Sequence, residues 1–279
     1  MINFCNVPIR FTPLVALLVL LSVVGCAPKL PLGTIQETPE AAWRAFRDNY
    51  CAPTEAPGIL ISASLRYTRV VPTRRTNLTR VSMWGNFDGA MRLDIAAGIG
   101  KLLAHIRENG DGLLVYYPSE NVAYAHINPV LGATRLGMPF PFSLNTLARV
   151  TMGDFSELAP KKYGNARSDG DHYIYDVNHG SIRSITLDKA GHPIIIEGTA
   201  PDAYEEKRMW QLSVERYGDE PLPLPGRVVL TMDDGEQGVL RVKSRELKKK
   251  AWPEKSTDLE LPEGALVKRL DNGYTSIKQ

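Results

Sequence analysis

Residues 59–68, ILISASLRYT, indicate the fold because apolar and polar side chains alternate along them. The odd-numbered positions carry Ile, Ile, Ala, Leu and Tyr, whereas the even-numbered positions after residue 60 carry Ser, Ser, Arg and Thr. Successive side chains of a β-strand point to opposite faces of a sheet, so this period of two predicts a strand with one buried face.

Similar segments recur along most of the chain and are separated by turn sequences such as Asn-Gly-Asp-Gly at 109–112. The other strands are predicted at about residues 77–87, 91–95, 101–108, 113–117, 122–127, 171–178, 181–188, 192–199, 208–217, 227–232 and 238–248. We count about eleven strands with alternating faces, and one highly curved antiparallel sheet accommodates that number better than a flat one. The chain is therefore predicted to be mainly β (α+β), with a barrel or half-barrel.

Residues 128–155 interrupt the strands and are richer in Leu, Met, Pro and Gly. Short helices are predicted there at about 129–136 and 143–152, and Ser143 suits the N-cap of the second. We expect these helices to plug or cover the mouth of the curved sheet. A longer helix is predicted at residues 38–50, followed by a proline-containing linker to residue 58.

The first 25 residues have the order of a secretory signal: a basic side chain, an apolar run and a small residue. The apolar run, residues 14–24, is shorter than the roughly 20 residues that a membrane-spanning helix needs. Val23-Val24-Gly25-Cys26 resembles the lipobox of bacterial lipoproteins. The resemblance implies cleavage before Cys26 and attachment of a diacylglyceryl group and an N-acyl chain to it. The alternative is an ordinary signal followed by an incidental cysteine.

The composition excludes some classes of protein. Lys and Arg number 33 against 31 Asp and Glu, so no strong field attracts the chain to nucleic acid. Of the three cysteines, Cys5 leaves with the signal and Cys26 is lipidated, so Cys51 stands alone and no disulfide framework exists. Cys51 is either a reactive thiol or, as we favour, a small buried apolar residue.

Three segments together resemble LolB-type outer-membrane lipoprotein receptors and the wider LolA/LolB-like superfamily. They are MRLDIAAGIGKLLAHI (91–106), GMPFPFSLNTLARVTMG (137–153) and LPLPGRVVLTMDDGEQGVLRVKSREL (222–247). The resemblance implies an unclosed barrel at residues 59–250, with helices across its mouth and an apolar cavity for acyl chains. The remaining parts are then a signal peptide (1–25), a lipidated tether (26–37), the N-terminal helix and linker (38–58) and a C-terminal extension (251–279).

The resemblance also implies a contact loop. LolB-type receptors project an exposed leucine from a β-turn in a Pro-Leu-Gly setting, and the matching position here is Ile99 in Gly98-Ile99-Gly100. Ile99 is therefore expected to stand in water and to touch a membrane or a client. The alternative is that it is an ordinary exposed apolar residue.

We expect the cavity to have the volume that an acyl chain needs, on the order of several hundred Å³. Its predicted lining is taken from the apolar faces of the strands and of the second short helix. The candidates are Leu65, Tyr67, Leu93, Leu103, Val115, Leu147, Trp210 and Leu212.

No enzyme signature is present in the sequence. His172 and Asp176 share a strand face, but three convergent metal ligands are not visible. A Gly-x-Ser-x-Gly elbow and a phosphate-binding glycine loop are also absent. We therefore expect no cofactor and no catalysis. The basic run RELKKK at 245–250 is interpreted as a solvated edge or as a surface attracted to anionic headgroups.

The sequence thus predicts a lipoprotein anchored in the outer membrane and facing the periplasm. It would bind acyl chains of lipoproteins or lipids and insert them into that membrane. A periplasmic LolA-type carrier is a delivering partner that the resemblance leaves open. The alternative is a structural or assembly lipoprotein with the same fold and without transfer activity.

Overall fold

The computed structural model describes residues 33–138, 141–201, 207–218 and 222–271. The signal, the lipobox with Cys26, and most of the tether lie outside the described residues, so their interpretation stays a prediction. No helix of the described part is long and apolar enough to cross a membrane.

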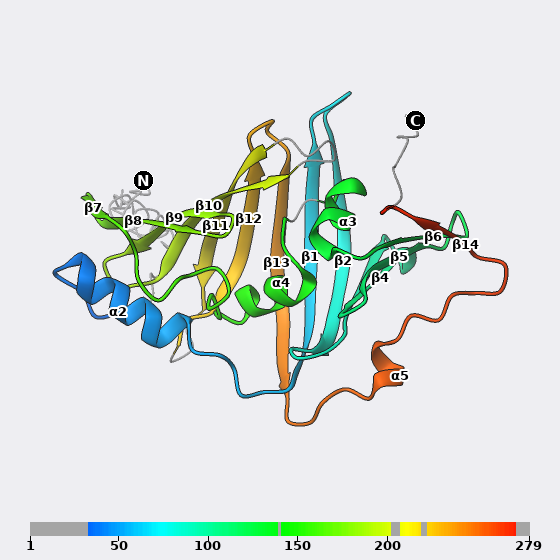
Figure 1. The fold of residues 1–279 in the computed structure, drawn as a ribbon, viewed down its shortest axis with the longest axis horizontal. Coiled ribbons are helices and arrows are strands. Elements are labelled where there is room, and N and C mark those ends of the chain that lie inside the picture. The colour runs from blue at the N-terminus through cyan, green and yellow to red at the C-terminus, as the bar shows by residue number, and fades with distance from the viewer. Residues whose placement is uncertain (1–32, 139–140, 202–206, 219–221, 272–279) are drawn as a thin grey trace, which may run out of the picture. The chain divides into compact units, whose positions relative to one another are not determined.

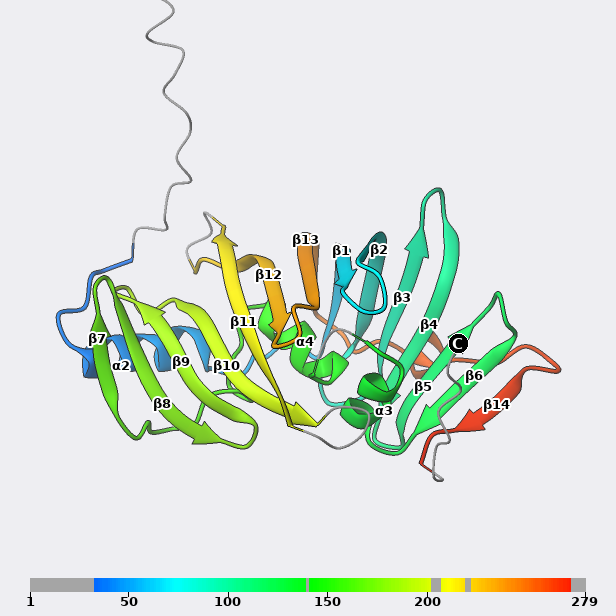
Figure 2. The same cartoon turned by 90° about the horizontal axis from the view of Figure 1, so that it is seen from above.

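A single sheet contains all the strands of the described residues (Figures 1 and 2). The first series is β1 (Gly58–Arg69), β2 (Arg75–Asn86), β3 (Met91–Ala97), β4 (Lys101–Asn109), β5 (Gly112–Tyr117) and β6 (Val122–His126). The second series is β7 (Ala166–Asp169), β8 (His172–His179), β9 (Ile182–Asp188), β10 (Pro193–Pro201), β11 (Lys207–Tyr217), β12 (Pro225–Met232) and β13 (Gln237–Lys248). A last short strand is β14 (Leu266–Arg269).

The two series are antiparallel meanders that meet in the middle of the sheet. There β1 pairs with β13, from Gly58 opposite Lys248 to Thr68 opposite Gln237. The strand order is β14-β6-β5-β4-β3-β2-β1-β13-β12-β11-β10-β9-β8-β7. The end strands β14 and β7 do not pair with each other, so the curved sheet stays unclosed, as the sequence predicts.

The inner face of the sheet carries the apolar positions of the alternating pattern. On β1, Ile59, Ile61 and Ala63 are almost fully buried, whereas Leu60 and Ser62 between them are half-buried. The same alternation holds in β11, where Trp210, Leu212 and Val214 are buried. Burial of these side chains from water is the main stabilising contribution to such a sheet.

Three helices pack against the inner face, and each begins as its sequence predicts. Helix α2 (Pro39–Tyr50) contacts β7 and β9, α3 (Pro129–Arg135) contacts β5 and β6, and α4 (Leu144–Thr151) contacts β3 and β12. Side-chain oxygens of Thr38, Asn128 and Ser143 accept hydrogen bonds from the first turns of these helices. The predicted helices at 129–136 and 143–152 are confirmed to within a residue or two.

The C-terminal extension, predicted at 251–279 without assigned elements, packs along the sheet in its described part, residues 251–271. Trp84 donates its indole N–H to the Ser256 carbonyl at 2.9 Å, and Arg92 donates to the Asp258 carbonyl. The extension contains α5 (Glu254–Thr257) and then adds β14 in parallel to β6. With β7, this strand brings the sheet above the predicted eleven or so. Each of these strands spans only four residues, which is too short to show a period of two.

Candidate functional site

An apolar cavity lies between the first meander and the helical insert, the segment 128–155. Its volume is about 50 Å³. The strands contribute Leu65, Val81, Leu93, Ile95, Ile106, Leu113 and Leu240, and the insert contributes Pro129, Ala133, Met138, Phe142, Leu144 and Leu147. Nearly all of this lining is aliphatic, so the cavity offers contacts to a hydrocarbon and few to a polar ligand.

One ionisable side chain, Glu108 on β4, also lines this cavity. Its carboxylate accepts hydrogen bonds from the backbone N–H groups of Leu144 at 2.7 Å and Asn145 at 3.4 Å, at the start of α4. Burial raises the pKa of the Glu108 carboxyl, although the hydrogen bonds from Leu144, Asn145 and Ser143 oppose this rise. Glu108 therefore fastens the N-terminus of α4 to the sheet.

A second small cavity, also about 50 Å³, adjoins the first through Met138, which lines both. Its wall is more polar and includes Tyr67, Arg208 and Glu236. Tyr67 donates its hydroxyl hydrogen to Glu236 at 3.0 Å, and burial followed by the nearby Glu236 charge raises the pKa of Tyr67. Met138 is the one residue common to both linings, and its side chain is flexible.

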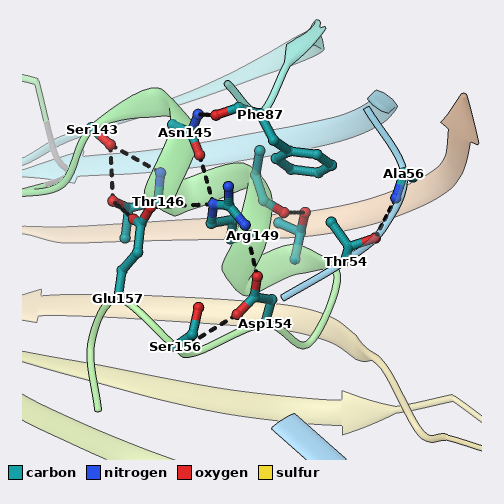
Figure 3. Close-up of polar contacts among 12 residues, drawn as sticks. Thr54, Ala56, Phe87, Ser143, Asn145, Thr146, Arg149, Asp154, Ser156 and Glu157 are labelled. Atoms are coloured by element: carbon teal, nitrogen blue, oxygen red, sulfur yellow. Dashed lines mark hydrogen bonds and ion pairs between the residues drawn. The ribbon is translucent and has the colours of Figure 1, made fainter. Parts of the chain in front are cut away.

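Polar contacts hold α4 and the loop after it in place (Figure 3). Arg149 donates to Asn145 and to Asp154, both at 2.9 Å, and pairs with Glu157 at 3.2 Å. The Asn145 amide in turn donates to the carbonyl of Phe87, beyond the end of β2. These contacts bind the insert to itself and to Glu157 and, through the Phe87 carbonyl, to the chain just beyond β2.

The structure brings together some of the predicted lining residues and separates others. Leu65, Leu93 and Leu147 line the aliphatic cavity, and Tyr67 lines the adjoining one. Val115, Trp210 and Leu212 are buried and line neither cavity. Leu103 is half-buried and also lines neither cavity, because the buried face of β4 carries the even-numbered residues Ala104, Ile106 and Glu108.

The expected volume is not found between the sheet and the insert. The two adjoining cavities leave about 50 Å³ each, far below the several hundred Å³ expected for an acyl chain. The physical reason is that Phe142, Leu144 and Leu147 of the insert fill the space over the strands, and Phe142 packs edge-on against Trp210 with centroids 4.9 Å apart. Residue types alone do not show how deeply an insert packs.

Sequence reasoning missed several lining residues that follow the same strand alternation. Ile95 continues the face of Leu93, and Ile106 lies on the buried side of β4 with Glu108. A charged residue in phase with buried apolar positions was a signal for Glu108. No comparable signal marks Met138 or Ala133, because their roles depend on how the insert packs.

The turn between β3 and β4 places Ile99 in solvent, with a relative exposure of 106%. Gly98 and Gly100 on either side have φ values of +55° and +83°, a region that favours glycine. A side chain added at either glycine would meet no atom within 4 Å. The turn therefore stands clear of the sheet and holds Ile99 at its tip.

The other candidates for chemistry form no larger cluster in the described part of the chain. No three His, Cys, Asp or Glu side chains converge there to hold a metal ion, and His172 is exposed. Cys51 is buried, as favoured from the sequence, and burial raises the pKa of its thiol to about 12. A protonated, buried thiol is a poor nucleophile.

Comparison with known proteins supports the fold. A solved LolA superfamily protein from Nitrosomonas europaea matches with a TM-score of 0.53 and 13% identity, over 80% of this chain and 98% of that one. A putative outer membrane lipoprotein-sorting protein domain from Vibrio parahaemolyticus matches at 0.45 and 12%, over 78% and 95%. No family model and no curated protein match the sequence. The likeness is to the LolA superfamily fold and does not single out LolB-type receptors.

Proposed function

We propose that this protein is a lipoprotein anchored in the outer membrane through Cys26, facing the periplasm, that binds acyl chains beneath its helical insert. It would pass lipidated clients to the membrane, and its action is binding and release without catalysis. The likeness of the fold to that of a LolA superfamily protein supports this proposal.

The observation that carries the proposal is the aliphatic lining under the insert. An acyl chain is recognised by apolar contacts, and the wall of this cavity supplies them from both the sheet and the helices. The present volume of about 50 Å³ has room for only a few methylene groups. Binding a whole chain therefore requires the insert to move away from the first meander.

A second candidate function is favoured by that same small volume. If the insert stays closed, the protein is an envelope structural or assembly lipoprotein whose interior is filled by its own side chains. The two candidates differ in one property, which is whether hydrocarbon ever contacts the cavity wall.

Photo-cross-linking in living cells tests this difference on the full chain. Phe142, which lines the cavity, is replaced with p-benzoylphenylalanine, which carries a photoreactive benzoyl group on the same phenyl ring. The matched control carries the same group at Phe155, which is fully buried beside α2. We expect lipid or lipoprotein adducts from position 142 and none from 155. Absence of adducts from both positions favours the structural alternative.

Anchorage is tested separately with Cys26→Ser. We expect this substitution to abolish incorporation of a radiolabelled fatty acid and to leave an uncleaved or soluble precursor. Label retained by the variant would remove the basis for the proposed location.

A further inference from the structure

The β1–β2 hairpin combines charge and exposure in a way that the cavity does not explain. Residues 58–87 contain five arginines and no aspartate or glutamate. All five are exposed, and among the described residues none makes an ion pair or a side-chain hydrogen bond. They are Arg66, Arg69, Arg74, Arg75 and Arg80.

Nearby carboxylates leave most of this charge uncompensated. The turn between β12 and β13 lies beside the hairpin and carries Asp233, Asp234 and Glu236. Asp233 and Asp234 pair with Arg208, at 3.5 and 2.5 Å, and Glu236 accepts the Tyr67 hydroxyl. Arg69, whose charge acts on Tyr67, lies near this group.

Apolar side chains are exposed at the same end of the sheet. Val71, in the hairpin loop, is 66% exposed and Leu78, on β2, is 68% exposed. Arg80 pairs with Ala96, so Leu78 lies level with Gly98 at the β3–β4 turn. Figure 1 shows the hairpin extending at the top of the view beyond the ends of its neighbours.

We propose that the β1–β2 hairpin is a docking surface for an anionic phospholipid bilayer. Guanidinium groups match phosphate oxygens in bidentate geometry, and exposed apolar side chains beside them enter the headgroup region. An acidic protein surface would satisfy the arginines and leave Val71 and Leu78 in water, so the bilayer fits both features. Docking brings the hairpin end of the sheet to the lipid surface and is independent of whether the insert opens.

The test uses the full-length lipid-anchored protein in liposomes, so it relies on the proposed anchorage at Cys26. Thr73→Cys places an environment-sensitive dye at the hairpin tip, and the buried Cys51 stays unlabelled. We expect a blue shift in liposomes that contain phosphatidylglycerol and a much smaller one in pure phosphatidylcholine. The shift should fall with rising salt, because screening weakens exposed charges.

The variant Arg74→Glu/Arg75→Glu should lower the equilibrium constant for contact of the hairpin with the anionic liposomes, obtained from the blue shift, by at least tenfold. The matched control is Lys161→Glu/Lys162→Glu, the same charge change at two exposed residues remote in sequence from the hairpin. An equal loss in the control, or no dependence on phosphatidylglycerol, would overturn the proposal. So would cross-linking of the tip in cells to a protein in place of phospholipid. Adducts at position 142 in the arginine variant would show that acyl binding stands whatever the hairpin result.

Discussion

The inner faces of the two meanders are covered by helices that carry different kinds of side chain. On the second meander, α2 supplies Trp43, Phe46 and Tyr50, and the ring of Trp43 lies 4.9 Å from that of Tyr175. On the first meander and the adjoining strands β11–β13, the insert supplies mainly aliphatic side chains and leaves the cavity of about 50 Å³. Space therefore remains under the insert, whereas the space under α2 is filled by packed aromatic rings.

This contrast explains why the insert, and not α2, has to move in the proposed function. Aromatic pairs add about 0.5–1.5 kcal/mol each beyond the area that they bury, so α2 is fastened by several such contacts. The insert packs through mostly aliphatic side chains and is also fastened by hydrogen bonds at the start of α4, through Glu108 and Asn145. The predictions below test whether the two covers differ in the strength and in the kind of their attachment.

The largest effect is expected at α2. Phe46→Ala should lower the free energy of unfolding by about 3–5 kcal/mol, because Phe46 is fully buried and packs near Phe155. Urea denaturation measures the change. Arg44→Ala on the exposed side of the same helix is the control and should stay within about 0.5 kcal/mol. A loss below about 1 kcal/mol for Phe46→Ala would contradict the view that α2 closes the core.

A smaller effect is expected in the insert. Asp154→Ala should cost about 2 kcal/mol, because it leaves the largely buried Arg149 with Glu157 and Asn145 as its remaining partners. Hydrogen exchange should then speed up in α4 and stay unchanged in α2. Glu157→Gln is the matched control and should cost less than about 1 kcal/mol, since Glu157 is exposed. Faster exchange in both helices would mean that the covers are not independent.

The contrast also shows what the sequence can and cannot predict. The period of two predicts β1 and its neighbours because alternation is a local property of the strand. The parallel pairing of β14 with β6 joins residues more than a hundred positions apart and has no local signal. The prediction of the cavity volume fails for a related reason. That volume depends on how Phe142 and Leu147 of the insert fill the space above Leu93.

A third prediction concerns pH. Burial raises the folded-state pKa of Glu108 above its ordinary value of 4.5, so the folded protein binds this proton more tightly than the unfolded chain. The contribution of this group to stability is complete below pH 4.5 and is lost as the pH rises through the folded-state pKa. In Glu108→Gln this pH dependence should vanish. The change in the free energy of unfolding should be smaller than that for Asp154→Ala. Denaturation of the wild type and of Glu108→Gln at pH 4 and pH 7 measures this dependence. An equal change in the free energy of unfolding between the two pH values in both proteins would contradict the assignment.

The smallest effect on stability is expected at the β3–β4 turn, where the functional effect should be large. Ile99→Glu should change the free energy of unfolding by less than about 0.5 kcal/mol, because Ile99 is fully exposed. Burial of such a side chain in a membrane contributes about 1.5–3 kcal/mol, so transfer of a lipidated client to liposomes should fall about tenfold or more. Ile99→Leu should keep both properties, whereas Ile95→Glu, which places a charge in the cavity wall, should unfold the first meander. If Ile99→Glu unfolds the protein, the turn belongs to the core; if it transfers normally, the turn has no part in delivery and the fold is unaffected.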